Sequence, residues 1–322
     1  MKAILFDQLG GPEVLKLGDA PIPEVRPGWV LLKNHAIGIN FADNFFRQGQ
    51  YLIKPKLPDT PGLEAAGVVE AVGPGVTHLK PGMRVTAIGT KTYAEYCVAS
   101  ANQVMPLPDF VNFAEGAAFP IQTLTAYHML QTSHQTTPGQ TVLVHSAAGG
   151  VGIVAVQIAK AAGARVIGTV SSDNKINLVK EYGADAVINY ATQDFAEEAM
   201  KLTDGKGVDL ILDAVGKPTL EQGLRCLAPL GHLILYGRAG GIPDPVNLMS
   251  LFQKSLKVSG FVLYTVSAMP EKHKEGIEKS FQLIGQGKLK MLVGKTFPLA
   301  EAAEAHRYME SRQSVGKLVL IP

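Results

Sequence analysis

Apolar runs of strand length recur through the second half of the chain, and segments of helical periodicity lie between most of them. The apolar runs lie at the start of 142–152 and at 164–172, 186–188, 208–214, 232–236 and 257–263. The helical segments are 153–163, 173–182, 192–202 and 217–226. Strands that alternate with helices imply right-handed βαβ units and a parallel sheet. Runs that are apolar on both faces fit a sheet covered by helices on both sides. The pattern therefore predicts a doubly wound, six-stranded parallel sheet.

The first part of the chain has a different pattern, because Pro-Gly and Gly-Pro pairs interrupt short β-like runs. Those runs are 29–33, 67–72 and 84–88. Short strands with frequent turn signals predict an irregular, mostly β domain. The last segment, 294–322, predicts a strand, a helix over 299–311 and a closing strand over 317–321. No linker marks a domain boundary, and the residues alone place one near 120–125.

The first strand of the second half ends in small residues and glycines. The segment 142–152 reads V-L-V-H-S-A-A-G-G-V-G, and a helix follows at once. Gly149, Gly150 and Gly152 let a ligand approach the backbone, and the free N–H groups at a helix start attract a pyrophosphate. The spacing departs from G-x-G-x-x-G, so an ordinary tight βα turn is the competing interpretation.

Composition narrows the class of protein. At 322 residues, of which 46% are hydrophobic, the chain is long enough for two domains, each with a core. A formal net charge of +2 gives no case for nucleic acid as a partner. The two cysteines, Cys97 and Cys226, form no disulfide framework, and no apolar run reaches membrane length. We expect a cytoplasmic protein.

Five motifs spread over the chain resemble those of one enzyme family. They are G-I-N-F-A-D at 38–43, P-G-L-E-A-A-G-V-V at 61–69, T-L-T-A-Y at 123–127, H-S-A-A-G-G-V-G at 145–152 and G-A-D at 183–185. Together they resemble the zinc-independent medium-chain dehydrogenases/reductases of the quinone oxidoreductase (zeta-crystallin-like) branch. The resemblance implies a GroES-like, β-rich catalytic domain formed by 1–122 and 268–322. It also implies an inserted Rossmann domain, 123–267, that binds NADPH, with the active site in the cleft between the two domains.

Metal ligands are lacking from two of these motifs. Zinc-dependent relatives carry Cys at the position of Asn40 and His at the position of Leu63, and only Glu64 remains here as a ligand type. Catalytic zinc needs three protein ligands, so we expect no metal site. Without a Lewis acid, simple alcohol oxidation is disfavoured, whereas reduction of an already activated acceptor is easier. A quinone or an α,β-unsaturated carbonyl is such an acceptor.

The choice of cofactor follows from charge. An NAD-selective site places a carboxylate about 20 residues past the glycines, at the end of the second strand. Ser171 and Ser172 stand there, and Lys175 follows one helical turn later. Hydroxyl groups and a lysine favour a 2′-phosphate, so we predict NADPH. Asp173 is interpreted as the N-cap of the next helix. The resemblance adds Tyr190 and Arg312 to the 2′-phosphate site.

The resemblance also implies the remaining cofactor contacts. Asn40 and Thr125 are expected beside the nicotinamide, and Gly149, Gly150 and Val151 beside the pyrophosphate. Four further contacts follow the fourth and fifth strands, namely Val215, Tyr236, Gly237 and Arg238. Phe261 and Val262 are expected to close the nicotinamide pocket, and core packing is the competing interpretation for Val262.

Two aromatic residues are the predicted substrate contacts. By analogy, Phe45 and Tyr51 flank the cleft, and Tyr51 could stack on a flat quinone ring. Tyr51 could instead donate a proton to an enolate as a general acid, or merely cover a loop. The catalytic set predicted from the sequence is therefore Asn40, Tyr51 and Thr125.

The function predicted from the sequence is that of an NADPH:quinone oxidoreductase without a metal. The sequence leaves open whether electrons pass as a hydride or singly. The alternatives are an enone or enoyl-thioester (carbon–carbon double bond) reductase and a non-catalytic NADPH-binding or RNA-binding protein. The family commonly pairs through the edge of the nucleotide domain, so we expect a homodimer.

Overall fold

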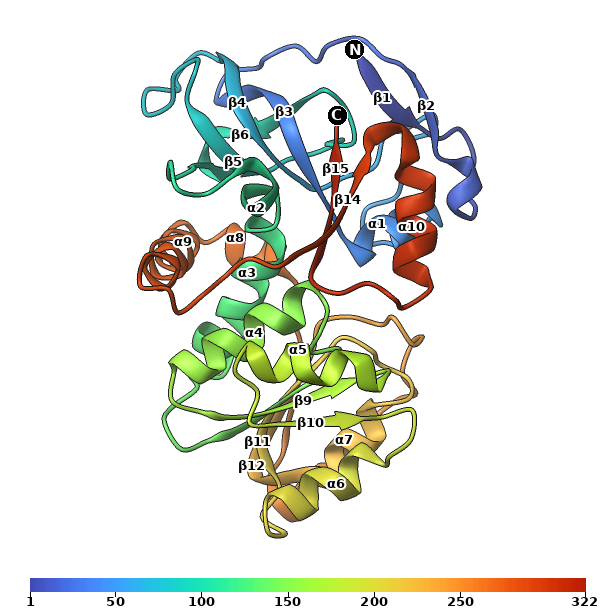
Figure 1. The fold of residues 1–322 in the computed structure, drawn as a ribbon, viewed down its shortest axis with the longest axis vertical. Coiled ribbons are helices and arrows are strands. Elements are labelled where there is room, and N and C mark those ends of the chain that lie inside the picture. Colours follow the sequence, from blue (N-terminus) through green and yellow to red (C-terminus); the bar gives the residue numbers. More distant parts are fainter. The chain divides into compact units, whose positions relative to one another are not determined.

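The computed structural model describes residues 1–322 and divides into two compact units (Figure 1). The first unit comprises Met1–Ile121 and Met291–Pro322, and the second comprises Gln122–Lys290. The domain limits predicted from the sequence, 122/123 and 267/268, stay a prediction. The second unit is continuous in the sequence and interrupts the first.

The second unit is built on a parallel sheet of six strands. They are β8 (Thr141–Val144), β9 (Arg165–Val170), β10 (Ala186–Asn189), β11 (Val208–Asp213), β12 (Leu227–Leu235) and β13 (Lys257–Gly260). Their order is β10-β9-β8-β11-β12-β13, and every neighbouring pair is parallel. The strand order reverses between β8 and β11, which is where doubly wound sheets bind ligands. The predicted sheet is confirmed.

Helices follow most of these strands. They are α4 (Gly150–Ala161), α5 (Ile176–Glu181), α6 (Phe195–Leu202) and α7 (Leu220–Cys226), with a 3-10 turn at Asp173–Lys175. Leu143, Ile167, Ile211 and Leu233 are completely buried on the strands and pack in one apolar cluster with α6 and α7. Burial of this kind on both faces of the sheet supplies most of the stability of such a domain.

Several predicted limits are wrong, and local hydrogen bonds explain two of them. The sixth strand was expected to run to Leu263, but it ends at Gly260 and helix α8 (Leu263–Ser267) begins. The helix expected from 217 begins at Leu220, because the hydroxyl of Thr219 donates to the carboxylate of Asp213 and holds the preceding turn. The helix expected from 192 begins after Asp194, whose side chain caps it.

The second unit also contains helices that the apolar pattern did not predict. They are α3 (Pro120–Tyr127), which begins at the end of the first unit, a π-helix (His128–Ser133), a 3-10 helix (Leu248–Lys254), and α9 (Pro270–Gly285). The buried residues of α9 are His273, Gly276 and Ser280. The imidazole of His128 packs on Gly276, where an added Cβ would lie 2.5 Å from Nε2. Helix α9 therefore belongs to the second unit.

The first unit contains a seven-stranded sheet. Its strands are β14 (Val293–Pro298), β15 (Lys317–Ile321), β3 (Trp29–Ile39), β4 (Glu64–Val72), β5 (Arg84–Ile88) and β7 (Val104–Pro106), with β6 (Tyr96–Ser100) paired to β3. Strands β14 and β15 are parallel and the other pairs antiparallel. The predicted run 29–33 is the start of the much longer β3. Strand β15 lies beside β3 (Figure 1), so the end of the chain completes this sheet.

Smaller elements complete the first unit. A two-stranded sheet joins β1 (Lys2–Leu5) to β2 (Lys16–Asp19), and the helices are α1 (Phe41–Arg47), α2 (Phe113–Ala117) and α10 (Ala302–Glu310). Short 3-10 turns occur at Pro12–Val14, Ala101–Gln103 and Leu299–Glu301. Both cysteines are buried and free. The helices are all too short or too polar to span a lipid bilayer.

Candidate active site

The glycine-rich turn leads directly into α4. Gly149 is the N-cap in extended conformation, and no side chain caps the helix. The first N–H groups of a helix have no acceptor within the helix, so this end is left to bind an anion. A Cβ on Gly152 would overlap the carbonyl oxygen of Ser146 and would lie 2.8 Å from Cα of Ala147. Only glycine allows the helix to start this close to the strand.

Most of the predicted cofactor residues follow the carboxyl ends of strands. Those in the second unit are Gly149–Val151 after β8, Ser171 after β9, Tyr190 after β10, Val215 after β11, Tyr236–Arg238 after β12, and Phe261 and Val262 after β13. The strands are all parallel, so their carboxyl ends form one edge of the sheet. The structure therefore gathers these residues at a single edge.

The loops after β11 and β12 are tied together by Asp213, which the sequence analysis missed. Its buried carboxylate accepts hydrogen bonds from the N–H groups of Val215 (2.7 Å) and Gly216 (3.1 Å) and from the hydroxyl of Thr219. Its carbonyl oxygen accepts from the N–H of Tyr236 at 2.9 Å. An acidic residue directly after the apolar run 210–212 was the available signal. Asp213 thereby fixes two of the predicted cofactor loops.

Gly237 and Tyr236 are constrained as well. A Cβ on Gly237 would lie 2.6 Å from the carbonyl oxygen of Ala214, so the two loops pack backbone against backbone. Burial, followed by the nearby charge of Asp213, raises the pKa of the Tyr236 hydroxyl well above its ordinary range. Tyr236 therefore stays neutral and acts as a hydrogen-bonding or packing group.

The end of β9 has the composition expected of a 2′-phosphate site. Burial lowers the pKa of Lys175, whose side chain is mostly covered. The interpretation of Asp173 as a helix cap is wrong. Ser172 occupies the N-cap position without a capping hydrogen bond, and Asp173 accepts from Nδ2 of Asn189 at 2.7 Å. Asn189 ends β10 and reaches across to the carboxylate.

The remaining predicted contacts of the second unit differ in their surroundings. Thr125 is buried on α3. The N–H of Phe261 donates to the carbonyl of Leu235 at 2.9 Å, which continues the pairing with β12. Val262 is the N-cap of α8 and is half-buried, so it is a turn residue rather than part of the strand.

In the first unit, Asn40 is surrounded by charged groups. Its Nδ2 donates to Oε1 of Glu64 at 2.7 Å, and its Oδ1 accepts from Nζ of Lys317 at 2.8 Å. Lys317 and Glu64 also form an ion pair, in which both side chains are buried. Lys317 was not among the residues predicted from the sequence, and it lies 277 residues from Asn40.

The backbone of Asn40 is fixed by a second buried group. Asn40 is the N-cap of α1, and its N–H donates to Oδ2 of Asp43 at 2.8 Å. The hydroxyl of Tyr93 donates to the same oxygen at 3.0 Å. Burial raises the pKa of Asp43 to about 7, although these hydrogen bonds favour its ionised form. The start of α1 is therefore held by buried polar side chains.

The predicted substrate contacts lie at the other end of α1. The ring of Phe45 packs edge-to-face on Phe41, with centroids 5.4 Å apart. The N–H of Tyr51 donates to the carbonyl of Phe45 at 3.1 Å, so the following loop returns to the helix. Leu52 in that loop is 72% exposed. Arg312 follows α10 in the first unit and has a φ of 61°, in the left-handed region.

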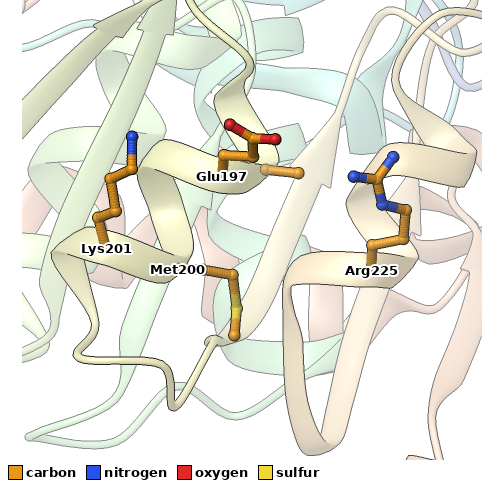
Figure 2. Close-up of a pocket in the computed structure, with 5 residues that line it drawn as sticks. Glu197, Met200, Lys201 and Arg225 are labelled. Carbon is orange, nitrogen blue, oxygen red and sulfur yellow. The ribbon is translucent and has the colours of Figure 1, made fainter.

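Neither a metal cluster nor the open hollow between α6 and α7 marks a competing site. No group of three or more His, Cys, Asp or Glu side chains is arranged to hold a metal ion. An open hollow lies between α6 and α7, lined by Glu197, Met200, Lys201 and Arg225 (Figure 2). None of the predicted site residues lines it. The roles predicted for the site residues remain predictions.

Known proteins resemble the chain over its whole length. The alcohol dehydrogenase GroES-like domain matches residues 26–109, and the zinc-binding dehydrogenase family matches residues 150–279. The quinone oxidoreductase of Pseudomonas aeruginosa is 41% identical over 100% of this chain and 99% of that protein. The 2-haloacrylate reductase of a Burkholderia species is 38% identical over 99% of this chain and 98% of that protein.

A solved structure of the same family is closely superimposable. The Escherichia coli quinone oxidoreductase complexed with NADPH has a TM-score of 0.96 and 37% sequence identity, and the match covers 100% of both chains. Its fold and the two matched domains agree with those described above. The chain therefore belongs to the quinone oxidoreductase family of the medium-chain dehydrogenases/reductases.

Proposed function

We propose that the protein is an NADPH-dependent quinone reductase that works without a metal. The observation that carries this proposal is the uncapped, glycine-built start of α4 at the carboxyl edge of the parallel sheet. That end of the sheet is where the fold binds a dinucleotide. Membership of the quinone oxidoreductase family supports the choice of acceptor, and the relative crystallised with NADPH supports the choice of cofactor.

The residues at the end of β9 fit NADPH better than NADH. Asp173 is the one carboxylate close by in sequence, and its Oδ1 already accepts from Asn189. Ser171 and Lys175 are neighbouring groups of the types that bind a 2′-phosphate. We assign Tyr190 and Arg312 to the same phosphate by their likeness to the family.

NADPH supplies the reducing equivalents when it is bound, and the protein orients the reactants. Gly149, Gly150 and Val151 would hold the pyrophosphate through backbone N–H groups. Asn40 and Thr125 would hold the nicotinamide carboxamide through uncharged hydrogen-bonding groups. A reduced quinone takes its protons from water, so this reaction needs no dedicated acid from the protein.

Phe45 and Tyr51 would form the contact surface for a flat acceptor. The ring pair of Phe41 and Phe45 and the turn that joins Tyr51 to Phe45 give this end of α1 an aromatic character. Aromatic rings stack favourably on the face of a quinone.

The test is the oxidation of NADPH, compared with NADH, in the presence of 1,4-benzoquinone, 9,10-phenanthrenequinone and a simple enone. We expect quinone turnover that prefers NADPH and is insensitive to a chelator. Turnover of the enone alone would move the protein to the double-bond reductases. Tight NADPH binding without any turnover would show that the protein binds NADPH without being a catalyst.

A double-bond reductase is the second candidate, because one close relative is a 2-haloacrylate reductase. Reduction of an enone needs a proton on carbon, and Tyr51 would be its donor. Replacing Tyr51 with Phe would then reduce turnover of an enone strongly. The same substitution would affect quinone turnover much less, since the reduced quinone is protonated on oxygen.

We also propose a homodimer formed along β13. This strand is the edge of the six-stranded sheet, and an unpaired edge can accept a second strand. The neighbouring 3-10 helix buries none of its residues, and Leu248 and Phe252 are each 71% exposed. An apolar surface of this kind is typical of an interface between subunits. A cytoplasmic location is proposed as well, supported by two cysteines that remain thiols.

A further inference from the structure

The side chains of Asn40, Glu64 and Lys317 form a closed ring of hydrogen bonds. Lys317 Nζ donates to Oδ1 of Asn40 at 2.8 Å and to Oε1 of Glu64, and Nδ2 of Asn40 donates to the same Oε1 at 2.7 Å. The ring contains one cation, one anion and one neutral amide. Each member therefore contacts both of the others.

The sheet of the first unit brings the three residues together. Strand β15 pairs with β3 so that Leu318 lies opposite Ile39, which places Lys317 beside Asn40. On the other side of β3, Glu64 lies opposite Gly38. A register fixed by many backbone hydrogen bonds thus sets the positions of all three side chains.

The ring is buried and closely packed. Glu64 is 0% and Lys317 3% exposed. The second carboxylate oxygen of Glu64 accepts the N–H of Ile121 at 2.7 Å. A Cβ on Gly38 would lie 2.6 Å from Oε1 of Glu64, so only glycine at this position leaves room for the carboxylate. Buried ions with several partners in a tight space keep one geometry.

This ring decides which way the amide of Asn40 points. An ammonium can only donate and an ionised carboxylate can only accept. Turning the amide over would place NH₂ against NH₃⁺ and C=O against COO⁻. The backbone N–H of Asn40 is held separately by Asp43 at 2.8 Å. One N–H hydrogen and one oxygen lone pair of the amide remain, both in fixed directions.

We propose that Lys317 is a positioning residue, which holds the carboxamide of Asn40 in the single orientation that binds the nicotinamide. The inference rests on the proposed function, since it places the ring of NADPH at Asn40. A buried ion pair adds little to stability compared with apolar residues of the same size, so the fold alone does not require it. The orientation of Asn40 is what the pair supplies.

The experiment is a double-mutant cycle of Lys317→Met and Asn40→Ala, with Lys295→Met as the control. Lys295 is exposed on the neighbouring strand β14. NADPH affinity is measured by nicotinamide fluorescence, and kcat and KM are measured with a quinone. We expect Lys317→Met to lower either the affinity for NADPH or kcat about 10- to 100-fold. This is the range for loss of a charged hydrogen bond.

The coupling distinguishes positioning from a structural role. If Lys317 acts through Asn40, Lys317→Met has little further effect in the Asn40→Ala background. Full additivity of the two losses, or a Lys317→Met variant as active as Lys295→Met, would overturn the inference. If the single variant does not fold, Lys317→Met combined with Glu64→Gln removes both charges, and the cycle is then run between this charge-free pair and Asn40→Ala. A wild-type protein that fails to bind NADPH would refute the proposed function, and with it the nicotinamide role assigned to Asn40.

Discussion

The hydroxyl of Tyr93 lies 3.0 Å from Nε2 of His306, although 213 residues separate the two in the chain. The same hydroxyl lies 3.0 Å from Oδ2 of Asp43. A hydroxyl has one proton, so when Asp43 is ionised Tyr93 donates to the carboxylate and accepts from the imidazole N–H. Nδ1 of His306 has no protein partner, so it would gain no hydrogen bond by taking up a proton. The imidazole is therefore held neutral.

His306→Gln should reduce the sensitivity of the first unit to acid. Burial, followed by the charge of Arg47, lowers the pKa of His306 to about 3. The unfolded chain therefore binds a proton that the native state excludes, and stability falls as pH drops from the ordinary histidine pKa of 6.5 toward 3. Without the histidine, the free energy of unfolding should depend less steeply on pH. The slope should fall by about 1.4 kcal/mol per pH unit in this range.

The single tryptophan makes this measurable. Trp29 lies on β3, so its fluorescence during urea unfolding reports on the first unit. The raised pKa of Asp43 changes the pH dependence of stability in the opposite direction. Asp43 is present in both the wild type and His306→Gln, so its contribution cancels in the comparison. His35→Gln, at an exposed position, is the control. Equal slopes for wild type and His306→Gln would show that His306 does not stay neutral.

Gly152→Ala should destabilise the second unit and weaken NADPH binding. The new methyl group would overlap the backbone of Ser146 and Ala147, so the strand and the start of α4 must separate. Overpacking of this kind costs about 1–3 kcal/mol. Thermal unfolding and fluorescence titration with NADPH measure both effects. Gly285→Ala, at the end of α9, has open space around it and should lower neither, and a Gly152→Ala variant that behaves likewise would contradict the close packing.

Lys175→Met should reduce the preference for NADPH over NADH. Loss of one charged contact to a 2′-phosphate corresponds to about a tenfold rise in the KM for NADPH. NADH has no such phosphate, so its KM should not change. Lys180→Met, at an exposed position on α5, serves as the control. Equal effects on both cofactors would remove Lys175 from the phosphate site.

Leu248→Ser combined with Phe252→Ser should convert a dimer into monomers. The two side chains lie on the 3-10 helix and are each 71% exposed. Sedimentation velocity of the wild type and the double variant measures the change. Leu52→Ser, at an equally exposed position in the first unit, should leave the dimer intact. A monomeric wild type would contradict the proposed dimer.

Local patterns predict the second unit well because its elements are local in the sequence. The apolar run at 208–214 predicts a strand, and the glycines at 149–152 predict the start of a helix. Neither prediction needs contacts that are distant in the sequence. Helix α9 was not predicted because its fully buried residues are His273, Gly276 and Ser280, none of which is a large apolar residue. Leu263 was assigned to a strand because it continues an apolar run, yet it begins α8.

The arrangement around Asn40 could not be predicted for a different reason. Lys317 reaches Asn40 through the antiparallel pairing of β15 with β3, which joins opposite ends of the sequence. Such a register depends on the whole sheet, and no local pattern encodes it. The residue type did not indicate that Lys317 is buried either, because a lysine in a terminal strand is ordinarily exposed.

The interrupted first unit has a consequence for synthesis on the ribosome. The second unit is complete once Lys290 has emerged, whereas the first still lacks β14 and β15. Domains generally fold as units while translation proceeds. A nascent chain stopped after Lys290 would thus contain the complete second unit. The side chain of Asn40 would still lack its hydrogen bond from the ammonium group of Lys317. Strand β15, which is translated after the whole second unit, is the strand that completes the hydrogen-bonded ring around Asn40.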